Sequence, residues 1–153
     1  MDIDSLVLKC MTKSSYHEPL TARTVASCFD SPYSIYCEKF VDKEEKDKIS
    51  EYDKLLFQKG NDHETNVVHE KYPNAVSVSF ESPEIGFRST VESMVNGDDI
   101  LHAMPVYYLP NGVYGIPDML EKSDTGSSVF GDYHYTVTEV KVAKNIRKSH
   151  LIQ

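Results

Sequence analysis

The sequence has few cysteines and no long hydrophobic run, and each shortage excludes a class of protein. Its three cysteines, Cys10, Cys28 and Cys37, form no C-x-x-C pair, so neither a disulfide framework nor a self-contained zinc site is predicted. No apolar run approaches the roughly 20 residues that a membrane-spanning helix needs, and the first residues lack the basic and apolar regions of a signal peptide. No membrane partner is therefore expected, and a cytoplasmic location follows by default.

The chain also has fewer basic than acidic residues. The chain has 16 lysines and arginines against 24 acidic residues, a net charge of -8, which argues against a protein that coats nucleic acid. A nuclease is not excluded, because part of the acidity would belong to a metal site. From Lys141 to the end of the chain the charged residues are all basic. This basic tail, with Lys144, Arg147 and Lys148, would either contact a phosphate backbone or be a solvated chain end.

The organisation is that of one domain without repeats or low-complexity linkers. Residues 1–20 are expected to be a loosely attached N-terminal arm, and residues 21–153 a single domain. Cap residues and helical spacing predict helices at 21–27, from Pro32 on, at 51–71 and at 86–96, the last ended by Asn96-Gly97. In the second of these, Ile35, Tyr36 and Phe40 are expected to face the core.

The helix at 51–71 is predicted to place a histidine on its inner face. Leu56, Gly60, His63 and Val67 recur at intervals of four, three and four residues, so they share one face. We therefore expect His63 to point toward the core. Gly60 is expected to let this helix lie close against a neighbour.

Four segments have the pattern of strands: residues 76–80, 100–109, 113–122 and 133–143. Asn111-Gly112 predicts a two-residue hairpin between the second and third, and residues 124–128 a turn between the third and fourth. This order brings Asp118 and Glu139 to one end of an antiparallel pair. Glu139 and Lys141 would share a face, with Val140 and its neighbour Val142 on the opposite one.

An aspartate followed by Glu-x-Lys is suited to holding Mg²⁺ against a phosphodiester. Mg²⁺ prefers oxygen ligands and is usually held by one or two carboxylates together with a substrate phosphate. Asp118 and Glu139 would supply the carboxylates, and Lys141 would orient the nucleophile and offset charge on the phosphate. The alternative is a solvated hairpin face, because this spacing is common by chance. A lone helical histidine such as His63 can likewise be an ordinary core or surface residue.

Six short segments between residue 31 and the end of the chain stand in an order typical of one nuclease family. They are Ser31-Pro32-Tyr33 with Cys37; Gly60-Asn61-Asp62-His63-Glu64; Thr90-Val91-Glu92-Ser93-Met94 with Gly97 and Ile100; Gly115-Ile116-Pro117-Asp118-Met119-Leu120; Phe130-Gly131-Asp132-Tyr133-His134-Tyr135; and Glu139-Val140-Lys141-Val142-Ala143. In this order they resemble the RecB-like branch of the PD-(D/E)xK nuclease superfamily, which includes the Cas4-type exonucleases.

The resemblance implies a fold, a reaction and a set of ligands. Position by position, the family's helix histidine falls on His63, its aspartate on Asp118, and its Glu-x-Lys pair on Glu139 and Lys141, with the carbonyl of Val140 as a further metal ligand. The implied activity is Mg²⁺- or Mn²⁺-dependent hydrolysis of DNA, with single-stranded DNA or DNA ends as partner, in repair or CRISPR-type processing. The implied fold is a mixed α/β (α+β), restriction-endonuclease-like core, with a central mixed sheet and an antiparallel hairpin flanked by helices.

The resemblance also implies what this chain would have to obtain elsewhere. In the family a helix after the Glu-x-Lys strand opens with a glutamine, which falls on Gln153. The rest of that helix and the next strand are expected to be missing, so that residues 21–153 form a domain incomplete at its C-terminus. A continuation chain or a homo-oligomer would supply them. Cys37 resembles a cluster cysteine of Cas4-type relatives, but no iron–sulfur cluster is expected in this chain, because such clusters need four cysteines.

Three functions therefore remain open from the sequence. The first is a metal-dependent DNA nuclease. The second is a catalytically incomplete nuclease-like fragment that binds nucleic acid or a protein. The third is an interaction domain in which the Asp118 and Glu139 pattern is coincidental.

Overall fold

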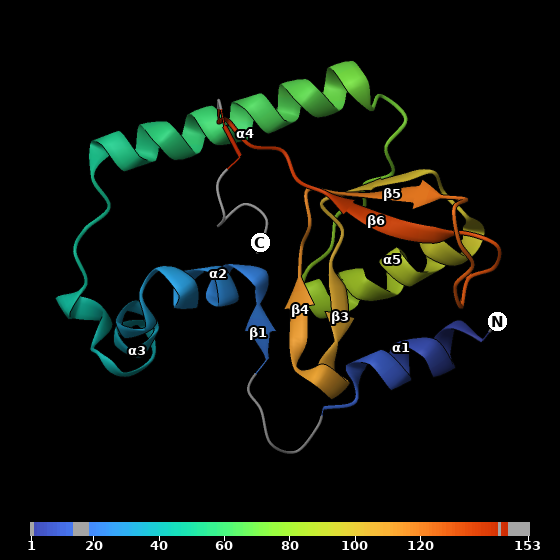
Figure 1. Ribbon diagram of the computed structural model, residues 1–153, viewed down its shortest axis with the longest axis horizontal. Helices are drawn as coiled ribbons and strands as arrows, with labels where there is room; N and C mark the ends of the chain where they lie inside the picture. The colour runs from blue at the N-terminus through green and yellow to red at the C-terminus, as the bar shows by residue number, and fades with distance from the viewer. Residues whose placement is uncertain (1, 14–18, 144, 147–153) are drawn as a thin grey trace.

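The chain folds into a mixed α/β structure built on two small sheets (Figure 1). The computed structural model describes residues 2–13, 19–143 and 145–146. Within these residues there are five helices, α1 (Ile3–Met11), α2 (Ala22–Asp30), α3 (Pro32–Phe40), α4 (Glu51–Lys71) and α5 (Pro83–Asn96). The strands are β1 (Leu20–Thr21), β2 (Ile100–His102), β3 (Val106–Tyr108), β4 (Val113–Gly115), β5 (Met119–Ser123) and β6 (His134–Thr138).

The sheets have three strands each, in the orders β1-β4-β3 and β2-β5-β6. Parallel pairing joins β1 to β4, and the other strand pairs are antiparallel. Two extended segments of the chain contribute to both sheets, because each is interrupted midway. The first passes from β2 to β3, and the second passes back from β4 to β5.

The interruptions correct the predicted strands, which were too long. Residues 100–109 break between β2 and β3, where Ala103 has a positive φ of 51° and Pro105 follows. Residues 113–122 break at Ile116, Pro117 and Asp118. Proline has no N–H to donate, so it ends ladder pairing. The hairpin between β3 and β4 is confirmed, although its turn is a 3₁₀ turn (Leu109–Asn111) ending at Gly112, whose φ is 66°.

The strand predicted at residues 76–80 is wrong. Val76 alone makes an isolated parallel bridge to Leu101, and the other residues of that segment pair with no strand in the described chain. Alternation of valine and serine suits a half-buried strand, but a strand forms only where a partner edge is free along its length. Here the edge beside Val76 is only as long as β2.

Some helix ends follow the predicted capping residues, but α2 continues to Asp30, beyond the predicted residue 27, and α5 begins at Pro83, before the predicted residue 86. The Thr21 side chain accepts a hydrogen bond from the Thr24 amide at the start of α2. Pro32 occupies the first turn of α3, although the Ser31 side chain makes no cap hydrogen bond. At the end of α5, Gly97 adopts a left-handed conformation with φ 75° and closes the last turn.

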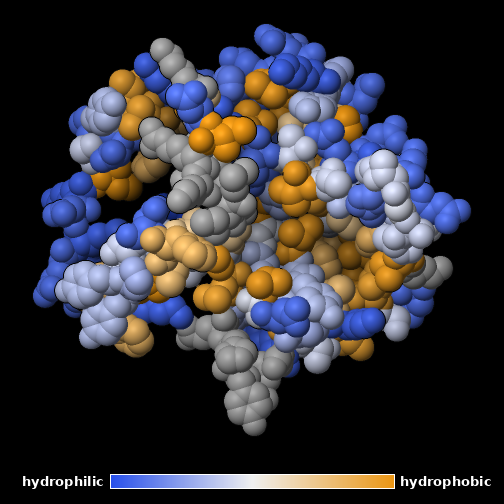
Figure 2. Space-filling view, viewed as in Figure 1, coloured by the Kyte–Doolittle hydropathy of each residue, from blue (hydrophilic) through white to orange (hydrophobic). Residues whose placement is uncertain are grey.

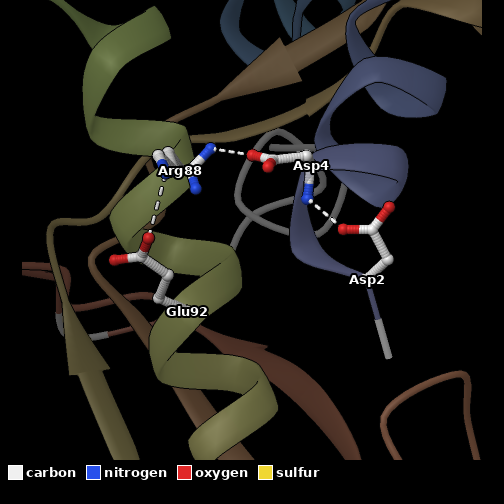
Figure 3. Close-up of polar contacts among 4 residues, drawn as sticks. All are labelled: Asp2, Asp4, Arg88 and Glu92. Atoms are coloured by element: carbon white, nitrogen blue, oxygen red, sulfur yellow. Dashed lines mark hydrogen bonds and ion pairs between the residues drawn. The ribbon is translucent and has the colours of Figure 1, made fainter.

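The N-terminal segment predicted as a loose arm contains a packed helix. Ile3, Leu6 and Val7 of α1 lie against the buried cluster of α5 and β3. Arg88 of α5 binds Asp4 of α1 and donates a 3.0 Å hydrogen bond to Glu92 on its own helix, as Figure 3 shows. These exposed ion pairs add little stability, so the apolar contacts are what hold α1 in place.

The core lies around α5, which packs against both sheets. One buried cluster consists of Phe87, Val91, Tyr107 and Leu109, and the other of Met94, Leu101, Met104 and Leu120. Thr90, fully buried between them, donates a 2.7 Å hydrogen bond to the Pro105 carbonyl. No helix in the described part of the chain is long and apolar enough to cross a bilayer.

The helices α3 and α4 stand apart from this core, and α3 corrects a prediction. Tyr36 and Phe40 of α3, expected to face inward, are 55% and 71% exposed, with ring centroids 5.1 Å apart. The bounds predicted for α4 are confirmed, but the helix buries none of its residues. In Figure 1 it crosses the molecule on the side opposite α1.

Candidate functional site

Asp118 and Glu139 lie at one end of the second sheet, as predicted. Asp118 directly precedes β5 and Glu139 directly follows β6. The ladder between these strands pairs Met119 with Thr138, so its next step places Asp118 opposite Glu139. Pro117, which is buried, fixes the backbone just before Asp118.

Each carboxylate has one polar partner in the adjoining segment. The amide of Val140 donates a 2.6 Å hydrogen bond to Asp118 Oδ2. Lys141 Nζ lies 2.7 Å from Glu139 Oε2, with the side chains 33% and 23% exposed. Among the described residues, the second oxygen of each carboxylate has no polar partner. It is therefore these two oxygens that remain available to a ligand.

A cavity of about 650 Å³ adjoins this end of the sheet. Asp118, Glu139 and Lys141 line it on one side, and Arg23 of α2 also faces it. The rest of its wall is mainly apolar and comes from β1, α2, β3 and β4. The apolar and aromatic residues in the wall are Leu20, Val25, Val106, Tyr107, Tyr108, Val113, Tyr114, Ile116, Pro117 and Val137.

A smaller cavity of about 240 Å³ lies between α4 and the segment after β6. Asp118 and Lys141 line it as well as the larger cavity, and Val140 and Val142 line only the smaller one. The predicted alternation of residues 139–142 is therefore only partly seen, because Lys141 lines both cavities and Val142 is 63% exposed. The strand predicted at residues 133–143 is also too long, since β6 ends at Thr138. Asp118 and Lys141 lie between the two spaces.

The predicted position of His63 is wrong, because this side chain is exposed and lies outside both cavities. Its neighbour Glu64 lines the smaller cavity opposite Asp118, and Glu64 Oε1 lies 3.2 Å from His102 Nε2 of β2. One residue turns a helix by about 100°, so an error of one position moves a side chain out of the site.

The signal for Glu64 was present in the sequence. Gly60, Glu64, Val67 and Val68 form a stripe at intervals of four, three and one, and all four are partly buried. The alternative phase through His63 relied on Leu56, which is 47% exposed. A stripe ending in two valines is the stronger apolar pattern.

Few carboxylates gather at this end of the sheet. The described residues contain no group of three or more His, Cys, Asp or Glu side chains placed around one ion. Asp118 and Glu139 instead offer two carboxylates on adjacent chain segments. Mg²⁺ is commonly held by one or two carboxylates, with water and phosphate completing the shell. Val140 contributes its amide N–H to this end of the sheet, through the bond to Asp118.

Four residues were predicted to contact nucleic acid. All of them lie outside the described residues: Lys144, Arg147, Lys148 and Gln153. The three cysteines are free and sit on α1, α2 and α3. Burial raises the pKa of the Cys10 thiol, because the thiolate loses its hydration there.

Comparison of the chain with family models, with curated proteins and with solved structures finds no match.

Proposed function

We propose that this protein is a Mg²⁺- or Mn²⁺-dependent DNA nuclease of the RecB- and Cas4-like kind, with Asp118, Glu139 and Lys141 in its active site. One observation supports the proposal above the others. The three side chains line the same cavity from two paired segments, with both carboxylates at one sheet end. In this proposal β2-β5-β6 is the central sheet of a restriction-endonuclease-like core, and α5 is the helix that covers one side.

The two carboxylates would hold the ion. Their unpartnered oxygens are the ligands, while the Val140 amide keeps the Asp118 side chain in its orientation. When bound, the ion polarises a phosphoryl oxygen and lowers the pKa of bound water. Without it, the negative charge of Asp118 and Glu139 would repel a phosphate, so DNA binding should also depend on the ion.

Lys141 is placed to act on the phosphate. Its ammonium group lies between the two cavities and is held by Glu139 Oε2 at 2.7 Å. An ammonium in that position stabilises the charge that develops on the phosphate oxygens and orients the attacking water. Glu64 lines the smaller cavity from α4, where its partner is His102, and it forms no three-ligand group with Asp118 and Glu139.

A second function is favoured by one observation. Both carboxylates already have a partner, Val140 N–H for Asp118 and Lys141 for Glu139, and the described residues hold no three-ligand cluster. These contacts would suit a nuclease-like module that binds nucleic acid or a protein without turnover. Such a module would show no cleavage that depends on Asp118.

Cleavage of end-labelled single-stranded DNA in Mn²⁺ tests the proposal. We expect Asp118→Asn and Lys141→Met each to lower the rate by at least about 100-fold, the scale on which loss of one charge-stabilising group acts. Asp124→Asn is the matched control, because Asp124 is exposed in the turn between β5 and β6. Equal rates for Asp118→Asn and Asp124→Asn would show that the activity, if present, does not come from this site.

A further inference from the structure

We propose that the 650 Å³ cavity is a base-binding subsite, in which an unpaired nucleobase stacks on Tyr108 while its phosphate lies at Asp118 and Lys141. The inference rests on the proposed nuclease function and adds to it a named place where one unpaired base would bind. Four features of the cavity support it: an open sheet face, an aromatic ring, paired charges at one side, and size.

The sheet β1-β4-β3 has one covered face and one open face. Tyr107 and Tyr114 pair across β3 and β4 and stack with ring centroids 5.3 Å apart, and both pack with Phe87 of α5 in the core cluster. Alternation along a strand turns Val106 and Tyr108 to the other face. These residues line the cavity, as do Tyr107 and Tyr114, and Figure 2 shows hydrophobic side chains gathered near the middle of this side of the molecule.

Tyr108 is the side chain best suited to receive a base. It is 41% exposed and its hydroxyl has no hydrogen-bond partner among the described residues. Val113, directly opposite on β4, is 45% exposed, and Leu20 on β1 is 39% exposed. A ring flanked by aliphatic side chains accepts any base, because every base has a π-face to stack.

The charges in the wall suit a nucleotide more than an apolar helix. Arg23, in the first turn of α2, lines the cavity and makes no ion pair with any described residue. Asp118, Glu139 and Lys141 line it as well. An apolar segment packed here would cover these charged groups at a large desolvation cost. A nucleotide instead places its base on the apolar wall and offers phosphates to Arg23 and Lys141.

The size of the cavity favours single-stranded over double-stranded DNA. A volume of about 650 Å³ lies within the range of pockets for single small molecules, far below what a duplex would need. A paired base would therefore have to leave its stack before entering. An unpaired or terminal base enters without that cost, so single strands and frayed ends should bind in preference to blunt duplex.

Binding is measured with Asp118 and Glu139 intact, in Ca²⁺ in place of Mg²⁺ or Mn²⁺ to limit cleavage, using a fluorescent oligothymidylate. We expect Tyr108→Leu to weaken its binding about tenfold, which is the scale of one lost base–aromatic stack, and Tyr108→Phe to bind as tightly as the parent. Tyr52→Leu is the matched control, because Tyr52 is 67% exposed on α4 and lies outside both cavities. Thermal unfolding of each variant checks that the fold is intact.

Photocrosslinking gives a second readout that does not depend on affinity. An oligothymidylate with a terminal 5-iodouracil should crosslink to Tyr108, identified by mass spectrometry, and a blunt duplex with the same base should not. Unchanged affinity of Tyr108→Leu, or crosslinks confined to residues outside the cavity, would overturn the subsite.

The outcomes separate this inference from the nuclease proposal. If wild-type protein cleaves DNA through Asp118 but Tyr108→Leu changes neither affinity nor crosslinking, the subsite is wrong and the nuclease stands. If no cleavage occurs but binding and crosslinking require Tyr108, the subsite stands and the nuclease proposal fails.

Discussion

Single residues decide the geometry at the end of the second sheet. Asp118 follows a buried proline, precedes β5, and accepts the Val140 amide at 2.6 Å. Its place beside Glu139 was predicted, but the interruption at Pro117 was not, because residues 113–122 were predicted to be one strand. The position of Glu64 on the inner face of α4 was predictable from the stripe that ends in Val67 and Val68, whereas the phase through His63 is wrong.

Two glycines in helices differ in what surrounds them and should respond differently to alanine. A Cβ on Gly86 would lie 2.6 Å from Phe80 Cγ and 2.9 Å from Pro105 Cγ, whereas one on Gly60 meets nothing within 4 Å. We expect Gly86→Ala to lower the free energy of unfolding by about 1–2 kcal/mol, because overpacking outweighs the gain in helix propensity. Urea unfolding monitored by circular dichroism measures this.

Gly60→Ala is the matched control in the same experiment. With free space around it, this substitution should raise the free energy of unfolding by up to about 1 kcal/mol through helix propensity alone. The open space also shows that the close helix approach predicted at Gly60 is wrong. A loss of stability in Gly60→Ala as large as that in Gly86→Ala would contradict this account of the two sites.

Among whole elements, helices were predicted better than strands. Helix bounds depend on nearby capping residues, whereas strand lengths depend on pairing with distant segments. The bounds of α4 followed from its caps and composition, and the ends of α2 and α5 from Thr21 and Gly97. The lengths of the strands did not, because each long extended segment changes sheets at Pro105 or Pro117. The alternation of apolar and polar residues predicts that a segment is a strand, but it does not predict which sheet the strand joins.

The two long helices should differ in how well their amides are protected from exchange. Helix α5 buries Phe87, Val91 and Met94, whereas α4 buries none of its residues. We expect amides in α4 to exchange at least about tenfold faster than those in α5, because opening α4 exposes little apolar surface. Native-state hydrogen exchange measures both helices in one sample.

The substitution His102→Ala tests which contact holds α4 against the second sheet. The Glu64 to His102 interaction at 3.2 Å ties the middle of the helix to β2, and Tyr72 donates a 3.3 Å hydrogen bond to Glu121 near its end. His102→Ala should therefore speed exchange in α4 further without changing α5. Equal protection of the two helices in the wild-type protein would show that α4 is more firmly packed than these contacts indicate.

At the scale of the whole molecule, the fold leaves one sheet face open beside a charged sheet end. The mixed α/β class was predictable from alternating helical and strand patterns. The division into two sheets, and the cavity that results from it, was not, because it arises from contacts between distant segments such as β1 and β4. Asp118 and Glu139 were predicted to lie together because they flank two segments with the pattern of paired strands.

The buried tyrosines should make global stability depend on alkaline pH. Burial, with the Glu84 carboxylate nearby, raises the pKa of Tyr107 to about 12, against about 10 for an exposed phenol. A pKa raised in the folded state contributes stability that is complete below pH 10 and is lost as pH rises toward about 12. The free energy of unfolding should fall across this window, and Tyr107→Phe should reduce the fall by on the order of 1 kcal/mol. Urea unfolding from pH 9 to pH 11.5 tests this, and an identical pH profile in Tyr107→Phe would contradict it.

The central claim is that Asp118 and Glu139 together bind one divalent ion at the end of β5 and β6. Calorimetric titration with Mn²⁺ tests it most directly, using the wild-type protein, Asp118→Asn and Asp124→Asn. We predict a single site in the wild-type protein and in Asp124→Asn, and loss of that site in Asp118→Asn. Binding that is equally strong in Asp118→Asn and Asp124→Asn, or no binding in the wild-type protein, would contradict the account.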